Sequence, residues 1–200
     1  MCKEVNGVNA VLNHHGKDDL KSIKTKNALY AALSFLLENY SFEKITVRNI
    51  CEEALISRAA FYAHFGDKYN LLLYWLMTLT ADIVVPGNTY ERTAHLINTI
   101  VNDNKKIIRN LIRDARKETL DVLLELILTT LDFSGTGKKE DERHTVLSSF
   151  YAGGILHYLL WQVEHKFPQD IRPMNEHLYE LMKHIQTLSD KGGIGYEQNN

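Results

Sequence analysis

The chain has 200 residues, and its formal net charge at pH 7 is −2 with histidine counted as neutral. Hydrophobic residues make up 44% of it and charged residues 24%, so it is able to bury a sizeable core. Its 11 glycines and 3 prolines are too few for collagen, low-complexity disorder or a turn-rich all-β fold. The small net charge gives no global positive field, so recognition of nucleic acid would depend on a local surface.

Two cysteines, Cys2 and Cys51, are too few for a disulfide framework, and we expect a reduced, cytoplasmic protein. Residues 1–13 carry acidic and amide side chains where a secretory signal would have an apolar segment. The most apolar stretch, residues 71–85, is interrupted by threonine and aspartate and ends before a Pro-Gly pair. It therefore predicts a buried helix, and we expect no membrane partner.

Residues 1–19 have no apolar period and predict a flexible N-terminal arm. From Leu20, apolar side chains recur at steps of three and four residues, which predicts a helix to near Tyr40. Three lysines occupy its first turns, where cations oppose the helix dipole. The sequence leaves open whether they form a solvated face or meet an external anion.

Two short helices are expected next, joined by a turn of three to four residues. Thr46 is a suitable N-cap for a helix over about 47–53, and Ser57 for a helix over about 58–64. Such a pair forms a helix-turn-helix, and basic and aromatic side chains on its outer face fit a helix inserted in a DNA major groove. The apolar side chains expected at the crossing are Val47, Ile50, Ala54, Ile56 and Phe61.

The rest of the chain also predicts helices, and no segment has the period of a strand, so we expect an all-α fold. Asp67 is the expected N-cap of a helix running to about residue 85. A surface loop is expected at 133–139, and a flexible tail at 191–200. The remaining predicted helical segments are 90–102, 104–113, 116–131, 140–166 and 174–188.

Three short sequences are specific in combination: Phe-Glu-Lys-Ile-Thr-Val-Arg-Asn-Ile at 42–50, Ser-Arg-Ala-Ala-Phe-Tyr-Ala-His-Phe at 57–65, and Asp-Lys-Tyr-Asn-Leu at 67–71. On these residues, the chain from about 20 to 76 resembles the DNA-binding domain of the TetR/AcrR family of bacterial transcriptional regulators. The resemblance covers little more than a quarter of the chain. The remainder fits the family in its helical character and its length.

The resemblance implies an all-α homodimer. Residues 20–66 would form an N-terminal three-helix, helix-turn-helix DNA-binding domain, and residues 67–190 a C-terminal helical ligand-binding and dimerisation domain. The implied function is sequence-specific binding of double-stranded operator DNA, most often in repression, under control of a small-molecule effector that the sequence does not identify. The alternative is a helical ligand- or protein-binding module without DNA binding, which would be indifferent to Tyr62 and Lys68.

The resemblance also implies which positions touch DNA. Arg58 is the candidate for a bidentate guanine contact, whereas an alanine offers only apolar contact, for example to a thymine methyl. A lysine near a helix N-terminus favours phosphate on physical grounds as well. The implied phosphate contacts are Thr46, Tyr62, His64 and Lys68, the implied base-reading positions are Arg48, Arg58, Ala59 and Ala60, and Ser57 completes the candidate set.

Two departures from the family's pattern leave the operator sequence open. Leu55 stands in the turn where glycine is common, and a leucine with positive φ costs roughly 1–2 kcal/mol. Ala59 and Ala60 stand where Gly-Thr or Ser-Thr is common, so a hydroxyl contact is lost. Three candidates also have structural alternatives, which are packing on the next helix for Tyr62, a helix cap for His64 and an ion pair with Glu52 for Arg48.

The expected dimer helices are residues 140–166 and 174–188. Apolar side chains go nearly all round the first of them between Phe150 and Trp161, so it must be buried on both sides. The Gly-Gly pair at 153–154 costs roughly 1–2 kcal/mol of helix propensity, which close approach of a second helix would justify. An intersubunit four-helix bundle accounts for both features, and an intrachain contact is the alternative.

An effector pocket would lie between the middle helices, although aromatic residues at helical spacing also fit an ordinary core. The candidate lining residues are Trp75, Tyr90, His95, Phe150, His157 and Trp161.

We expect no enzyme, no cofactor and no metal site. Nine histidines invite a metal, but the Glu-x-x-His and His-Glu-x-x-His patterns are both missing from the sequence. The sequence also lacks a glycine-rich phosphate loop and a nucleophile elbow.

Overall fold

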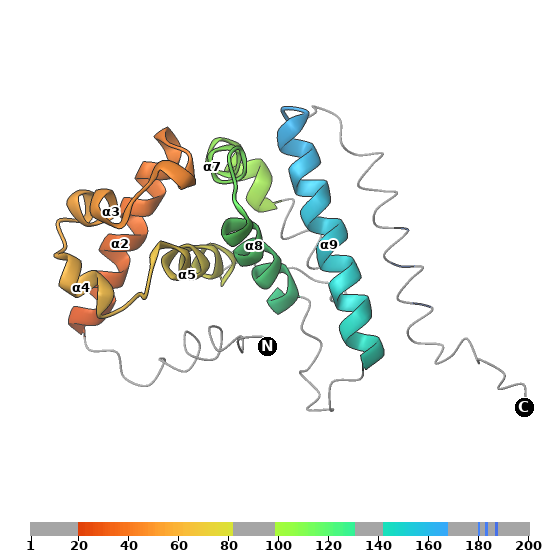
Figure 1. Ribbon diagram of the computed structural model, residues 1–200, viewed down its shortest axis with the longest axis horizontal. Coiled ribbons are helices and arrows are strands. Elements are labelled where there is room, and N and C mark those ends of the chain that lie inside the picture. The colour runs from red at the N-terminus through yellow and green to blue at the C-terminus, as the bar shows by residue number, and fades with distance from the viewer. Residues whose placement is uncertain are drawn as a thin grey trace, which may run out of the picture.

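The computed structural model describes residues 20–81, 99–130 and 142–167, and the single positions 180, 183 and 187. Every regular element in this part of the chain is a helix, which confirms the all-α fold class (Figure 1). The elements are α2 (Leu20–Asn39), the short 3-10 helix η2 (Phe42–Lys44), α3 (Val47–Ala54), α4 (Arg58–Tyr62), α5 (Lys68–Ala81), α7 (Lys105–Ile112), α8 (Lys117–Thr130) and α9 (Glu142–Glu164).

Several predicted segments lie outside the described residues. They are the arm at 1–19, the end of the helix expected to reach residue 85, most of the segment 90–102, the loop at 133–139, the tail at 191–200, and the helix at 174–188 apart from three positions.

The helices begin where their capping residues predict. Oγ of Ser57 accepts a hydrogen bond from the backbone N–H of Ala60 at 3.1 Å. Oδ1 of Asp67 accepts hydrogen bonds from the backbone N–H groups of Tyr69 and Asn70 at 2.9 and 2.8 Å. These bonds satisfy N–H groups that have no partner inside the helix, which explains why a local sequence signal located both starts correctly.

Two local features differ from the prediction. Helix α4 ends at Tyr62 rather than near residue 64, and the backbone N–H groups of His64 and Phe65 both bond to the carbonyl of Phe61. The 3-10 helix η2 was not predicted, because three residues are too short to show a period.

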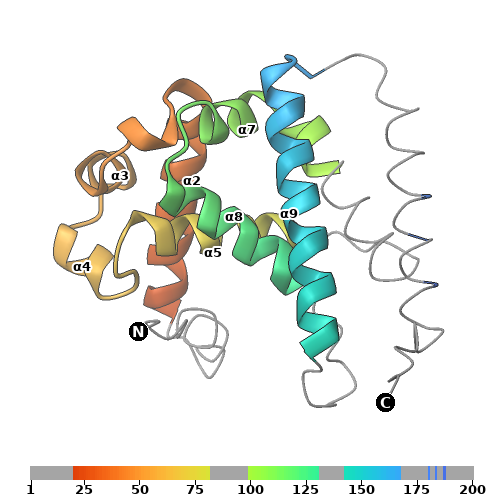
Figure 2. The same cartoon turned by 45° about the vertical axis from the view of Figure 1, so that its right-hand side comes forward.

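Helices α5 and α8 lie between α2 on one side and α9 on the other, and two views agree on this arrangement (Figures 1 and 2). The aromatic contact between α2 and α5 is close. Trp75 is only 1% exposed, its Nε1 donates to Oγ of Ser34 at 2.7 Å, and its ring stacks on Tyr30 with centroids 6.0 Å apart. One continuous apolar core extends from the helix-turn-helix to α9.

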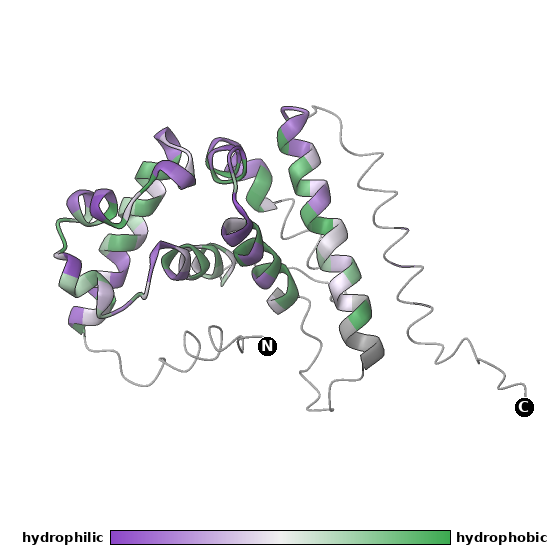
Figure 3. Ribbon diagram, viewed as in Figure 1, coloured by the Kyte–Doolittle hydropathy of each residue, from purple (hydrophilic) through white to green (hydrophobic). Residues whose placement is uncertain are grey.

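The hydropathy colouring shows apolar residues on α5 and α8, in the middle of the molecule (Figure 3). Of the apolar residues expected at the helix-turn-helix crossing, Ile50 and Phe61 are fully buried, and Cys51 between them is 5% exposed. A buried amide adds a polar contact between α2 and α7, since Nδ2 of Asn110 donates to the carbonyl of Leu37 at 2.8 Å. Helix α2 is therefore packed directly onto α7.

Helix α9 is buried on one side only. Tyr151 and Ile155 face the core at 5% and 3% exposure, whereas Val146 and Phe150 are 67% and 68% exposed. A Cβ added to either glycine of the pair at 153–154 would meet no described atom within 4 Å. The close approach expected at these glycines is thus not made by the described part of this chain.

None of the helices that the structure describes is both long enough and apolar enough to cross a membrane.

Candidate nucleic-acid interface

Helix α3 begins with a capping box that fixes its first turn. Oγ1 of Thr46 accepts a hydrogen bond from the backbone N–H of Asn49 at 3.2 Å, and Oδ1 of Asn49 accepts one from the backbone N–H of Thr46 at 3.0 Å. The Thr46 hydroxyl also donates to the same Oδ1 at 2.6 Å. Thr46 is exposed, so these local bonds hold its side chain at the surface where the resemblance implies a phosphate contact.

The turn after α3 does need a positive φ, and a leucine supplies it. Leu55 has φ 55° and ψ 35°, in the left-handed region, and its side chain is 92% exposed. The backbone N–H of Ile56 bonds to the carbonyl of Cys51 at 3.0 Å, and that of Leu55 to the carbonyl of Glu52 at 3.3 Å. This is the Schellman pattern that usually ends on glycine, so the departure seen in the sequence carries a conformational cost.

Helix α4 is held by a buried phenylalanine and presents its other residues outward. Phe61 is fully buried, and its ring lies 5.9 Å from that of Phe65. Tyr62 is 50% exposed, and its ring makes a T-shaped contact with that of Phe61, with the centroids 5.3 Å apart. The exposed candidates on this face are Ser57, Arg58, Ala59 and Tyr62, and Ala60 and His64 are half-buried.

Arg48 forms the ion pair that its spacing allows. Its Nε lies 2.7 Å from Oε1 of Glu52, one turn further along α3. Both side chains are exposed, at 78% and 59%. Such an exposed pair contributes little to stability, so it leaves Arg48 free to exchange its partner.

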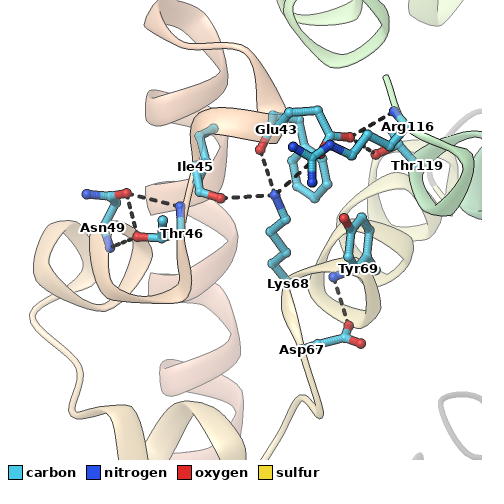
Figure 4. Close-up of polar contacts among 10 residues, drawn as sticks. Glu43, Ile45, Thr46, Asn49, Asp67, Lys68, Tyr69, Arg116 and Thr119 are labelled. Carbon is cyan, nitrogen blue, oxygen red and sulfur yellow. Dashed lines mark hydrogen bonds and ion pairs between the residues drawn. The ribbon is translucent and has the colours of Figure 1, made fainter. Parts of the chain in front are cut away.

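Lys68, a candidate phosphate contact, has protein partners in this structure (Figure 4). Its Nζ donates to the carbonyls of Phe42 at 3.0 Å and Ile45 at 3.1 Å, and it lies 4.4 Å from the centroid of the Phe42 ring. The side chain is only 15% exposed. Burial lowers the pKa of Lys68, and the nearby Glu43 carboxylate opposes that shift. The phosphate contact remains a prediction, and it would require Lys68 to leave these carbonyls.

Sequence reasoning missed Glu43, which is the acidic centre beside Lys68. Its side chain is 8% exposed, and its carboxylate contacts Thr119 and Arg116 at the start of α8. Burial raises the pKa of Glu43, but hydrogen bonds from Thr119 and Arg116 and the charges of Lys68 and Arg116 outweigh it, so the pKa lies below its ordinary value. These partners are 25 to 76 residues away, so no local spacing could have identified them.

Of the candidate pocket residues that the structure describes, one lies on α5 and three lie on α9. Trp75 is buried against α2, whereas Phe150 and His157 are exposed on α9. Trp161 is half-buried and stacks on His165 with centroids 4.4 Å apart. Two further candidates, at positions 90 and 95, lie outside the described residues.

An open cleft of about 480 Å³ lies between α2 and α3, and none of the candidate pocket residues lines it. Its lining residues are Leu36, Tyr40, Lys44, Ile45, Asn49, Glu52 and Glu53.

Comparison with known proteins identifies the N-terminal region. Residues 29–74 match the family model described as bacterial regulatory proteins, tetR family. This range includes α3, α4 and the turn between them. No curated protein matches the chain with significance.

Solved structures match over most of the chain, at low identity. A TetR-family regulator from Streptomyces coelicolor A3 is 17% identical, with 86% of this chain and 99% of that chain covered and a TM-score of 0.61. The dihydroxyacetone kinase operon activator DhaS is 16% identical over 83% and 98%, with a TM-score of 0.53. A TetR family repressor from Dietzia sp. strain DQ12-45-1b is 18% identical over 81% and 95%, with a TM-score of 0.51.

The family-model match confirms the resemblance drawn from the sequence for the N-terminal region. The chain carries the N-terminal domain of the tetR family of bacterial regulatory proteins, on a body with the fold of that family's transcriptional regulators.

Proposed function

We propose that this protein is a sequence-specific DNA-binding transcriptional regulator that acts as a homodimer. The observation that carries the proposal is the outward face of α4, where Arg58, Ala59 and Tyr62 are exposed while Phe61 anchors the helix to the core. Nothing in the described chain covers this face, and α3 and α4 lie at the end of the molecule opposite α9 (Figures 1 and 2). Insertion of α4 in a major groove would use this face.

The proposed contacts divide by chemistry. Arg58 is exposed, so its guanidinium is able to reach a guanine edge, and Arg48 reads an adjacent base after releasing Glu52. Ala59 and Ala60 contribute apolar contacts. Phosphate contacts are assigned to Thr46 and Ser57 at the two helix starts and to Tyr62 and His64 at the end of α4.

The exposed side of α9 supports the homodimer. Val146, Phe150, Gly153 and His157 recur at steps of three and four residues and are all exposed. The glycines there leave room for a second helix at close range. A two-fold dimer through α9 and the helix predicted at 174–188 would present two recognition helices about 34–36 Å apart, one turn of DNA.

We propose repression as the mode of action, with an effector bound in the C-terminal part changing the pose of α5 and so the separation of the two α4 helices. The similar structures include one described as a repressor and one described as an activator. A promoter fusion measured with and without the protein in the cell therefore tests the sign of regulation. Repression predicts lower reporter expression when the protein is present.

The primary test is selection of bound duplexes from random DNA, with a variant carrying Arg58→Ala and Tyr62→Ala beside the wild type. We expect enrichment of a palindrome that the variant binds much more weakly, because both side chains are exposed and their loss leaves the core intact. Lys106→Ala removes an exposed cation on α7 and is the matched control. A folded wild type that enriches no duplex at low salt would favour the alternative, a ligand- or protein-binding module.

A further inference from the structure

Glu43 caps a helix whose N-cap residue, Arg116, lies 73 residues further along the chain. Its Oε1 accepts a hydrogen bond from the backbone N–H of Arg116 at 3.1 Å and another from Oγ1 of Thr119 at 2.6 Å (Figure 4). Arg116 is the residue before α8, and its carbonyl accepts the first helical bond, from Leu120. Glu43 thus takes the part that an N3 glutamate has in an ordinary capping box, and its negative charge suits a helix N-terminus.

The second oxygen of the same carboxylate faces two cations. Oε2 of Glu43 lies 3.7 Å from Nε of Arg116 and 4.0 Å from Nζ of Lys68. Lys68 is the first residue of α5, and its ammonium holds the carbonyls of Phe42 and Ile45, one on either side of Glu43 in the sequence. The carboxylate therefore joins η2, the start of α5 and the start of α8.

This junction lies directly before the DNA-reading unit. Ile45, whose carbonyl Lys68 holds, is followed by Thr46, the N-cap of α3. A shift of the first turn of α8 relative to α5 would change the distances around Glu43. It would thereby displace Ile45, the residue before the N-cap Thr46. Glu43 is 8% exposed, so water is a poor substitute for these partners.

We propose that Glu43 is a positioning residue that sets the pose of α3 and α4 on the helical body and passes displacements of the start of α8 to them. Glu43 touches no DNA, and Lys68 serves the same junction through the carbonyls of Phe42 and Ile45. The consequence for operator affinity rests on the proposed function. The consequence for the pose of α4 relative to α8 does not.

The test compares three variants of the full-length chain. Glu43→Gln removes the charge and keeps the shape, and Thr119→Val removes the hydroxyl that donates to it. Glu118→Gln is the matched control, because it removes the same charge from an exposed position in the first turn of α8. Thr119→Val also serves if Glu43→Gln does not fold.

The first readout is the distance between α4 and α8, which needs no DNA. Spin labels are placed at the exposed positions Ala63→Cys and Asp121→Cys in a chain without its native cysteines, diluted with unlabelled chain. We expect the distance distribution to shift or broaden in Glu43→Gln and Thr119→Val, and to stay unchanged in Glu118→Gln. A wild-type distribution in both junction variants would overturn the proposal, whether or not the protein binds DNA.

The second readout is affinity for the selected duplex as a function of salt. We expect Glu43→Gln to weaken specific binding roughly tenfold without changing the slope of log K against log salt, because no phosphate contact is lost. Loss of a direct phosphate contact would reduce that slope by about 0.9, and Lys68→Met, which removes a predicted phosphate contact, is the reference for such a loss. A slope that Glu43→Gln reduces by as much would overturn the positioning role of Glu43.

Discussion

At the scale of single residues, Leu55 carries the backbone strain of a leucine with positive φ, which the sequence predicted as a possibility and the structure contains. A non-glycine residue in the left-handed region costs roughly 1–2 kcal/mol. Glycine at this position would remove that strain, but part of the stabilisation would be lost because glycine increases the conformational entropy of the unfolded chain. Because Leu55 is 92% exposed, its side chain contributes little to the core. The strain is therefore the dominant effect of this side chain on stability.

We predict that Leu55→Gly raises the free energy of unfolding by about 0.5–1 kcal/mol, as measured by chemical denaturation. Leu55→Ala is the matched control, because it shortens the side chain but keeps the Cβ that causes the strain, and we expect no gain from it. An equal gain in both variants would place the cost in the exposed leucine side chain instead of the backbone.

The pKa of Glu125 on α8 is shifted in the opposite direction to that of Glu43. Its Oε1 is buried and has no hydrogen-bond partner among the described residues, and burial raises the pKa of its carboxyl. A raised folded-state pKa means that ionisation at neutral pH costs stability, and that the cost disappears as the pH falls below the ordinary value near 4.3.

We predict that Glu125→Gln raises the free energy of unfolding at pH 7, by less than about 1 kcal/mol because water screens the partly exposed carboxyl, and that this gain decreases as the pH falls through the raised pKa of Glu125. Asp121→Asn, an exposed acid one turn earlier in α8, is the control and should change stability by less than about 0.5 kcal/mol. A gain for Glu125→Gln that does not depend on pH would contradict the electrostatic account.

At the scale of elements, the contact between η2 and α8 predicts the reverse dependence on pH. The folded-state pKa of Glu43 lies below its ordinary value, so the carboxylate adds stability that is fully present above that value. This contribution is lost as the pH falls through the lowered pKa. The groups around the carboxylate are Thr119, Arg116 and Lys68.

We therefore predict that Glu43→Gln is destabilising at pH 7 and that its difference from the wild type decreases as the pH is lowered below about 4.3. Denaturation curves for both proteins between pH 7 and pH 3.5 measure the difference. If the difference were as large at pH 3.5 as at pH 7, the hydrogen-bond geometry of the site and not the charge of Glu43 would account for it.

The elements themselves were largely predictable, because their signals are local. Thr46, Ser57 and Asp67 each bond to backbone N–H groups two or three residues away, so their positions in the sequence marked the helix starts. The end of α4 lies two residues before the predicted one, because the carbonyl of Phe61 already closes the last turn.

At the scale of the whole molecule, the apolar side of α9 is the feature that a single chain leaves unexplained. Phe150 is 68% exposed, and the aromatic ring of Tyr151 beside it is buried against the core. Aromatic residues and glycines on one exposed helix face are expected to be covered in a stable assembly. The proposed two-fold contact would cover them.

We predict that Phe150→Glu converts the protein from dimer to monomer in sedimentation experiments at micromolar concentration, because burying an unpaired carboxylate in an apolar interface is costly. Phe35→Glu places the same charge at a 53%-exposed phenylalanine on α2 and is the matched control. A Phe150→Glu protein that remains dimeric would exclude this face of α9 from the contact.

The sequence by itself determined the helical class, most helix boundaries and the identity of the N-terminal domain. These depend on apolar period, on capping residues and on three short motifs, all of which act over a few residues. It also marked Leu55 as a residue of interest, since the turn type and its requirement for positive φ are local.

Only the tertiary structure decided what the polar groups do between elements. Lys68 turns toward the carbonyls of Phe42 and Ile45, and Glu43 caps a helix whose N-cap residue lies 73 residues later. Trp75 closes the contact between α2 and α5, while Phe150 stays on the surface. The partners of these side chains are distant in sequence, and the packing of helices selects them, so no spacing along the chain encodes which groups meet.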